Sequence, residues 1–274
     1  MEVDEALLNL LPGVDDGVPA ALADAMRYSI TAGGKRLRPI LCLASAEAVG
    51  GDHRRALPVA CALEMIHTYS LIHDDLPAMD NDSMRRGQPT LHVVAGEGMA
   101  ILAGDGLLTH AFHLLAMHAP HAVSMVADAA GPRGMVGGQA IDLLTAPLDA
   151  AGLQRMHQMK TGALIRASAT CGAVAGGGTP PQAEAIDRAA AKFGLAFQIV
   201  DDILDVEGAS AQLGKTAGKD AAAGKPTYPA LYGLERSRAM ARECLERADE
   251  ILAAAGLADS RLPAIGRWIV ERSN

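Results

Sequence analysis

The sequence predicts an all-α protein, and three observations carry that prediction. Aromatic residues make up only 3% of the 274 residues, while Ala and Leu are abundant. β-branched residues occur in short runs only, which favours helices over sheets. Segments of helical length lie between breaks that contain Gly and Pro, and none shows the sustained alternation of a strand. Because half of the residues are hydrophobic, the chain has material for a substantial core.

The breaks separate the expected helical segments in order along the chain. The first segment ends at Gly33-Gly34 and the second at Gly50-Gly51. Four longer breaks follow, at residues 87–89, 131–138, 176–181 and 207–226. There is no internal repeat and no linker long enough to divide the chain. We therefore expect a single domain over residues 1–274.

Charge, cysteine content and hydropathy exclude several classes of protein. The formal net charge is −8 and no basic stripe with aromatic residues occurs, so we expect no nucleic-acid partner. The four cysteines lie far apart without a C-x-x-C spacing, which is typical of buried thiols in a reducing compartment. The chain begins with acidic residues where a signal peptide would be basic, and no apolar run approaches the ~20 residues of a membrane span. These patterns predict a soluble, cytoplasmic protein.

Two acidic clusters occur on segments that otherwise resemble apolar helices. The first contains Asp74, Asp75 and Asp80, and the second contains Asp201, Asp202 and Asp205. Carboxylates this close together repel one another and resist burial, so they are expected to bind a cation. Oxygen ligands in this number favour Mg²⁺, whose coordination shell is often completed by substrate phosphates. Facing helices of a bundle could bring the two clusters together around a polyphosphate.

The second cluster fits a regular helix. Asp201 and Asp205 are four residues apart and share a helix face, with Gln198 one turn earlier on nearly the same face. A solvated charged face is the alternative. That alternative is weakened because no Lys or Arg lies between Leu195 and Val206 to pair with the acids.

The first cluster requires an interrupted helix. Asp74 and Asp80 are six residues apart, an offset of about 240° on a regular helix, so they would point too far apart to share a ligand. Pro77 disfavours helical geometry at Leu76. We therefore expect a break that swings Asp80 back toward Asp74.

Basic residues form two compact groups, one running from Gly33 to Arg38 with Lys35, and one at Arg85-Arg86. Arginine forks match phosphate oxygens, and glycine permits close approach of the backbone. His67 lies on the same helix face as Asp74, about 10 Å away along the axis, and could meet a second anion. A structural hydrogen-bond donor is the alternative role for this histidine. Together the acidic and basic groups predict two neighbouring anions, one held through metal and one by direct cation contacts.

The stretch 207–226 is rich in Gly, Ala and Lys and has few large apolar residues. A loop of this length is either an exposed connection or a functional lid. The residues Lys215, Lys219 and Lys225 slightly favour a lid that closes over an anionic ligand.

Two other kinds of site fit the motifs less well. His67 with His73-Asp74 could form a His-Asp phosphohydrolase site, but that leaves the second acidic cluster without a purpose. A nucleotide-binding P-loop has no support, because Gly33-Gly34-Lys35 lacks the preceding spaced Gly and a following Ser or Thr.

With these motifs identified, the chain resembles the short-chain trans-polyprenyl diphosphate synthases, closest to bacterial farnesyl diphosphate synthase. The matching segments are residues 33–39, 64–90, 137–142, 160–165, 194–205 and 214–231. The resemblance implies an isoprenoid-synthase helical bundle around a central cavity, usually as a homodimer. It also implies a prenyltransferase that joins isopentenyl diphosphate to dimethylallyl or geranyl diphosphate by Mg²⁺-assisted ionisation of the allylic substrate.

The resemblance also implies a role for each motif residue. Two Mg²⁺ ions would bind Asp74 and Asp80 and a third Asp201, supported by Asp75, Asp202 and Asp205. Isopentenyl diphosphate would be bound by Lys35, Arg38, His67 and Arg86. The allylic diphosphate or its cation would be held by Arg85, Lys160, Thr161, Gln198 and Lys215, with Lys225 as a further contact. The catalytic residues among these would be Arg85, Lys160, Thr161 and Gln198.

Product length in this family depends on a bulky residue five positions before the first aspartate motif. That residue is Tyr69 here, with the small Ser70 beside it, so the sequence favours farnesyl diphosphate. Simple core packing of Tyr69 is the alternative role. Geranylgeranyl diphosphate is the second candidate product. A non-catalytic subunit would be expected to lose aspartate motifs, and a terpene cyclase would not need a second diphosphate site.

Overall fold

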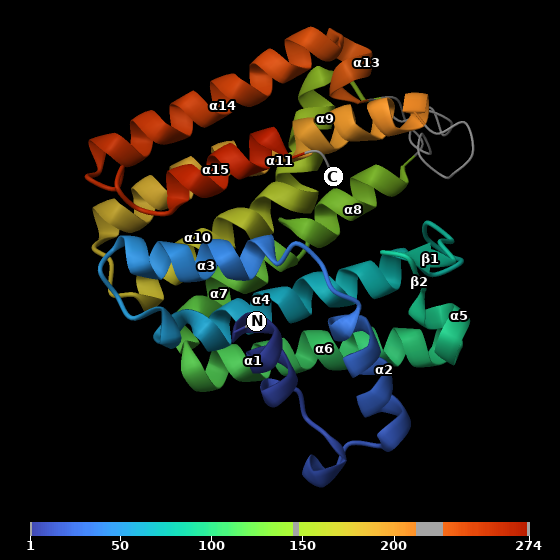
Figure 1. The fold of residues 1–274 in the computed structure, drawn as a ribbon. Helices are drawn as coiled ribbons and strands as arrows, with labels where there is room; N and C mark the ends of the chain where they lie inside the picture. The colour runs from blue at the N-terminus through green and yellow to red at the C-terminus, as the bar shows by residue number, and fades with distance from the viewer. Residues whose placement is uncertain (1, 145–147, 212–226, 273–274) are drawn as a thin grey trace.

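The computed structural model describes residues 2–144, 148–211 and 227–272, with only the backbone at 209–211. Predicted Lys215, Lys219 and Lys225 therefore lie outside the described residues. The helices are α1 (Glu2–Leu10), η1 (Val14–Asp16), α2 (Ala20–Thr31), α3 (Leu37–Ala48), α4 (His53–Asp74), α5 (Leu91–Ala95), α6 (Glu97–His118), η2 (Pro120–Ala122), α7 (Val123–Ala130), α8 (Met135–Leu143), α9 (Ala150–His157), η3 (Gln158–Gly162), α10 (Ala163–Ala175), α11 (Pro180–Ala211), α13 (Tyr228–Tyr232), α14 (Leu234–Ala254) and α15 (Leu262–Glu271). The predicted all-α fold is confirmed (Figure 1).

The centre of one half of the bundle is α4. Its middle turns are small or aliphatic, and Ala60, Cys61, Ala62 and Leu63 are all fully buried. A helix that is apolar on every side must be surrounded by other elements. The neighbours of α4 are α3, α6 and α10, and the resulting core extends to α1, α2 and α7.

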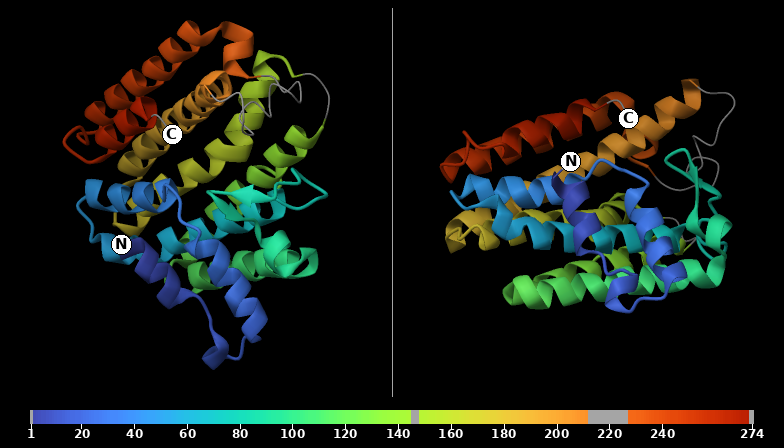
Figure 2. Two further views of the ribbon diagram at one scale, coloured as in Figure 1. Left: turned by 45° about the vertical axis from the view of Figure 1, so that its right-hand side comes forward. Right: turned by 60° about the horizontal axis from the view of Figure 1, so that its bottom comes forward.

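A second core surrounds α11, which packs against α10, α14 and α15. Phe193 is its largest fully buried side chain. Figure 2 shows α14 and α15 on one side of the bundle and α6 on the opposite side. Because α3 and α10 contribute to both cores, they join the two halves. That residues 1–274 form a single domain stays a prediction.

The helix that carries Lys160 and Thr161 is continuous from α9 through η3 to α10, but η3 is a π-helical turn. Such turns are rare and are often found at functional sites. Asp149 caps the start of α9 by accepting a hydrogen bond from the Gly152 N–H at 2.7 Å. The π turn thus interrupts a helix that is otherwise regular on both sides.

The breaks at Gly33-Gly34 and Gly50-Gly51 separate helices as predicted. The predicted breaks at 176–181 and 207–226 are both shortened by α11, which begins at Pro180 and continues to Ala211. The break at 131–138 is shorter than expected, because α8 already begins at Met135. Gly138 lies inside that helix, where a Cβ atom would come within 2.2 Å of the Lys160 backbone nitrogen. This glycine permits close packing of two helices.

A short hairpin was not predicted from the sequence. It pairs β1 (Met84–Arg85) with β2 (Gln88–Pro89) in antiparallel register, with Arg85 opposite Gln88. Two residues per strand are too few for the alternating pattern that marks a strand. Gly87, with a φ of 77°, provides the turn.

The expectation that no segment approaches the length of a membrane span is wrong for α6. This 22-residue helix is long and apolar enough by length and composition alone. Core helices of globular proteins have the same composition, and Ala103, Leu107 and Ala111 of α6 are fully buried. The strongest packing partner of α6 is α4, and the short α5 is the helix that precedes it.

The approach of α10 to α3 depends on Gly172. A Cβ atom there would lie 1.9 Å from the carbonyl oxygen of Cys42, which belongs to the α3 backbone and cannot turn aside. We expect Gly172→Ala to lower the free energy of unfolding by about 1–3 kcal/mol through overpacking, measured by urea denaturation.

The control is Ser124→Ala, which changes an exposed residue of α7. This substitution should stabilise the helix slightly, by less than about 1 kcal/mol. Equal stability of Gly172→Ala and the wild type would contradict the close-contact interpretation.

Candidate diphosphate site

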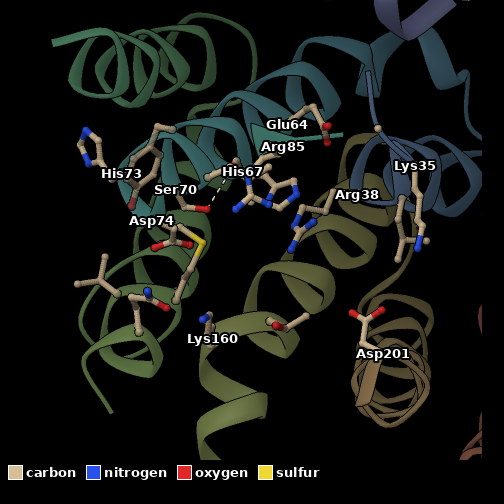
Figure 3. Close-up of a pocket in the computed structure, with 18 of the residues that line it drawn as sticks. Lys35, Arg38, Glu64, His67, Ser70, His73, Asp74, Arg85, Lys160 and Asp201 are labelled. Carbon is tan, nitrogen blue, oxygen red and sulfur yellow. Dashed lines mark hydrogen bonds between the residues drawn. The ribbon is translucent and has the colours of Figure 1, made fainter. Parts of the chain in front are cut away.

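A cavity of about 1110 Å³ lies between the two halves of the bundle. Its wall includes eleven of the predicted residues: Lys35, Arg38, His67, Tyr69, Ser70, Asp74, Arg85, Arg86, Lys160, Thr161 and Asp201. Figure 3 shows Asp74 entering the cavity from α4, and Asp201 entering it from α11 on the far side. The fold thus brings one carboxylate from each acidic cluster to the same space.

The helix break at the first cluster is present but comes earlier than expected. Helix α4 ends at Asp74, and residues 75–80 form turns. The Asp80 N–H donates to the Asp74 carbonyl at 2.9 Å, so the chain folds back as predicted. Burial raises the pKa of the Asp74 carboxyl to about 6, against the pull of Lys160 and with a further rise from Asp80. A bound cation would relieve this unfavourable charge, so the residues fit a divalent ion.

Asp75 has a different position from Asp74. Arg85 binds it with both ends of its fork, and the Nη2 to Oδ1 distance is 2.6 Å. The Asp75 side chain is buried while Arg85 is one-third exposed. This bidentate pair fixes the hairpin beside the end of α4 and places Arg85 on the cavity wall.

The second cluster is divided in a similar way. Asp201 lines the cavity, whereas buried Asp202 accepts hydrogen bonds from Gln198 Nε2 at 3.1 Å and from the Tyr228 N–H at 2.9 Å. Thr161 Oγ1 in turn donates to Gln198 Oε1 at 3.2 Å. This chain of hydrogen bonds orients the Gln198 amide and the Thr161 hydroxyl, which is the member of the chain that reaches the cavity. Within the described residues, no three His, Cys, Asp or Glu side chains gather as a preformed metal cluster.

Cations with few counter-charges form another part of the wall. Arg38 is only 9% exposed and its buried Nε has no hydrogen-bond partner among the described residues. Burial lowers the pKa of Arg38 to about 10. Burial, with Arg38 and Arg86 nearby, keeps the pKa of His67 well below its usual value of 6.5, so the imidazole is neutral. Burial, together with Arg272, also lowers the pKa of Lys35. A buried cation without a partner is costly, so this wall is suited to an anion.

Glycine and left-handed backbone shape this cationic wall. Arg86 donates from Nη1 to the Gly33 carbonyl. Its guanidinium lies where a Cβ atom of Gly34 would stand, and Gly34 has a φ of 139°. Arg36, with a φ of 49°, donates to the buried Glu64 at 2.8 Å and so fixes the start of α3 to α4.

Sequence reasoning missed four residues at the site. Asp142 accepts from Lys160 Nζ at 2.6 Å and orients it. Gln139 lines the cavity, and neither of its buried amide atoms has a partner in the described part of the chain. The segment 137–142 resembles the corresponding segment of the family, but its residue types alone indicate no role for its side chains. The other two residues are Glu64, the partner of Arg36, and Arg272, which contacts Asp201.

The remaining predicted residues lie elsewhere. Asp80 is exposed and Asp205 is half-buried, and neither is part of the cavity wall, nor is Gln198. Lys215 and Lys225 lie outside the described residues, so the proposed lid stays a prediction. Tyr69 is 7% exposed and packs edge-on against His73, with ring centroids 5.7 Å apart.

A helical bundle with carboxylates facing across a cavity that also has a cationic wall is the architecture of the isoprenoid synthases. The solved structures of similar shape agree. One is the apo FPP/GFPP synthase from Zymomonas mobilis, with a TM-score of 0.84 and 38% identity over 98% of this chain and 95% of that one. Another is the geranylgeranyl pyrophosphate synthetase from Pyrococcus horikoshii, with a TM-score of 0.87 and 32% identity over the same shares.

The polyprenyl synthetase family profile matches residues 19–255, and the chain belongs to this family. Among curated relatives from Arabidopsis thaliana, the large subunit 1 of the heterodimeric geranylgeranyl pyrophosphate synthase is 48% identical over 272 residues, which are 93% of this chain and 73% of the relative. Geranylgeranyl pyrophosphate synthase 7 is 47% identical over 271 residues, 93% of this chain and 78% of the relative. For the large subunit 2, the chain spans 65% of the relative's length at 48% identity.

The charge at Asp74 makes stability depend on pH. The folded-state pKa of about 6 lies above the ordinary 3.8, so the protonated carboxyl is favoured in the fold. That contribution is complete below about pH 4 and is lost as the pH rises through 6. In the metal-free protein, the stability of Asp74→Asn relative to the wild type should therefore grow by about 1–3 kcal/mol as the pH rises from 4 to 8.

Urea denaturation in the presence of a chelator at several pH values measures this difference. Asp259→Asn, at an exposed turn, is the matched control and should follow the wild type at every pH. A stability difference for Asp74→Asn that stays constant across the pH range would contradict the assigned burial of charge.

Proposed function

We propose that this protein is a prenyltransferase that condenses isopentenyl diphosphate with an allylic diphosphate, and that its main product is geranylgeranyl diphosphate. The observation that carries the proposal is the division of one cavity into two charged walls. Asp74 and Asp201 suit a diphosphate bound through Mg²⁺, and the cationic wall with Arg38 suits a diphosphate bound directly. Coupling two diphosphate esters requires both.

The reaction breaks the bond between the allylic carbon and the diphosphate oxygen. Mg²⁺, when bound at the aspartates, would supply positive charge to the leaving diphosphate. Lys160 and Arg85 line the cavity with Asp74 and would stabilise the same developing charge. Asp142 and Asp75 hold these two cations in place, so little reorganisation is needed during the reaction.

The allylic cation would form beside the diphosphate that leaves it. The double bond of isopentenyl diphosphate would attack the allylic cation and form the new carbon–carbon bond. The Thr161 hydroxyl, oriented through Gln198, is a dipole suited to that cation. The proton lost in the last step would pass to the departing diphosphate, since the motifs contain no dedicated base.

The geranylgeranyl product is supported by the names of the curated plant relatives. This differs from the farnesyl product expected from the sequence, which the relatives do not favour. Farnesyl diphosphate remains a second candidate because Tyr69 contributes an almost fully buried aromatic side chain to the cavity wall. An aromatic floor there would stop the chain one isoprene unit earlier, since one helical turn is about 5.4 Å.

Incubation with Mg²⁺, labelled isopentenyl diphosphate and each allylic diphosphate, followed by dephosphorylation and chromatography, tests the function. We expect incorporation that requires Mg²⁺ and gives mainly geranylgeraniol. Farnesol as the main product would favour the second candidate. No incorporation with any allylic partner would refute the proposed function.

The same assay on Tyr69→Ala decides the role of this side chain. If Tyr69 is the floor, its removal should lengthen the main product by about one isoprene unit. Tyr232→Ala, at a 42% exposed aromatic residue, is the matched control and should leave product length unchanged. An unchanged product from Tyr69→Ala would show that Tyr69 is core packing only.

We also propose that the protein is a homodimer formed through α5 and the start of α6. Val93, Val94, Ile101 and Leu102 are each at least 43% exposed. Because α5 packs against α6, this surface presents several large apolar side chains on two adjacent helices. Apolar patches of this kind on globular proteins mark interaction surfaces. A twofold axis would pair the patch with itself in a second copy.

Light scattering during size-exclusion chromatography should therefore give twice the chain mass for the wild type. Leu102→Asp should shift the protein toward the monomer at micromolar concentration, because it places a charge in the buried interface. Val14→Asp, at a 61% exposed position in η1, should remain dimeric. A wild-type monomer, or a Leu102→Asp variant that stays dimeric, would overturn this arrangement.

A further inference from the structure

Arg272 follows directly after α15 and has a buried guanidinium in contact with the proposed metal ligand Asp201. Its side chain is 1% exposed. Its Nη2 donates to Asp201 Oδ1 at 2.5 Å and to the Phe197 carbonyl at 2.8 Å. The Asp201 side chain is still 40% exposed, so an ion can reach the carboxylate from the cavity. Arg272 is thus already bound to the group on which a divalent ion would act.

The same guanidinium lies close to the cationic wall. Its central carbon lies 3.9 Å from the centroid of the Phe197 ring, and Lys35 Nζ lies 5.9 Å from that centroid. Phe197 therefore contacts two cations, and it lines the cavity. The pKa of Lys35 is lowered by burial and by Arg272, and raised by Asp201. Asp201 is the counter-charge for this group of cations.

Arg272 also has an unused donor. Its Nη1 is buried and has no hydrogen-bond partner among the described residues. A guanidinium has five N–H donors in a planar fork, and a buried donor without an acceptor is unfavourable. An anion beside Lys35 would give this group the acceptor that it lacks.

We propose that Arg272 is a positioning residue that competes with the divalent ion for Asp201 and then binds the diphosphate held by Lys35. This inference rests on the proposed function and adds a coupling between its two anion sites. When an ion takes the Asp201 carboxylate, the guanidinium loses its counter-charge and the neighbouring anion replaces it. Binding at either site therefore favours binding at the other.

The test compares Arg272→Met, which keeps the length of the side chain but removes its charge, with the wild type. The first readout is the unfolding temperature as a function of Mg²⁺ at a fixed concentration of inorganic diphosphate. Because a competing cation has been removed, Arg272→Met should reach half of its temperature rise at a Mg²⁺ concentration roughly threefold lower. The second readout is the KM for isopentenyl diphosphate, which should rise at least roughly fivefold.

A lower Mg²⁺ requirement together with a higher KM distinguishes a positioning role from a purely structural one. Loss of a purely structural residue would weaken the binding of both Mg²⁺ and isopentenyl diphosphate. Arg272→Lys keeps the charge without the planar fork, so it should recover part of the KM while leaving the Mg²⁺ requirement close to the wild type. Arg272→Gln, which also lacks the charge, replaces Arg272→Met if that variant does not fold, with the same two expectations. In an Asp201→Asn background, adding Arg272→Met should no longer change the Mg²⁺ requirement.

An unchanged or higher Mg²⁺ requirement in Arg272→Met, or an effect that persists in the Asp201→Asn background, would overturn the inference. The thermal measurement does not depend on turnover. If the wild type is not stabilised by Mg²⁺ with diphosphate, the proposed function itself fails. If the wild type is stabilised and Arg272→Met behaves identically, only the role of Arg272 fails.

Discussion

The site depends on the need to satisfy charges carried by helices that are otherwise packed inside the protein. Helix α4 is buried on all sides through its middle and then carries Glu64, His67 and Asp74 in its last three turns. Each of these groups must meet a partner, water or a ligand, because a buried polar group without a hydrogen bond is unfavourable and a lone buried charge is more so. Arg36 compensates Glu64, whereas Asp74 and His67 face the cavity. The cavity is therefore the part of the bundle that is lined by polar side chains such as Asp74 and His67 and not only by apolar ones.

The two adjacent aspartates of each acidic cluster have different roles. Of the adjacent residues Asp74 and Asp75, one faces the cavity and the other binds Arg85. Of Asp201 and Asp202, one faces the cavity and the other fixes Gln198 and the start of α13. Successive residues on a helix point about 100° apart, so a pair of aspartates naturally supplies one ligand and one support. The supporting carboxylate holds the groups that surround the ligand.

The sequence predicts the parts of this site that follow from residue type and local spacing. Pro77 predicts the return of Asp80 toward Asp74, and the groups at Lys35 and Arg85 predict the cationic wall. It does not predict partners that only the tertiary fold brings together. Arg272 reaches Asp201 across 71 residues, and nothing near Arg272 in the sequence marks it as different from a surface arginine. The hairpin is also missed, because two residues per strand carry no periodic pattern.

The π turn at Gln158–Gly162 has a consequence for how this helix can vary in sequence. A π turn contains one residue more than a regular turn, so the residues after it keep the orientation that a regular helix one residue shorter would give them. Deleting one of these five residues would therefore restore a regular helix with the buried face of α10 still toward α3 and α11, whereas deleting two would turn that face by about 100°. The segment can thus lose one residue without turning α10, but the loss would change which side chains occupy the positions of Lys160 and Thr161.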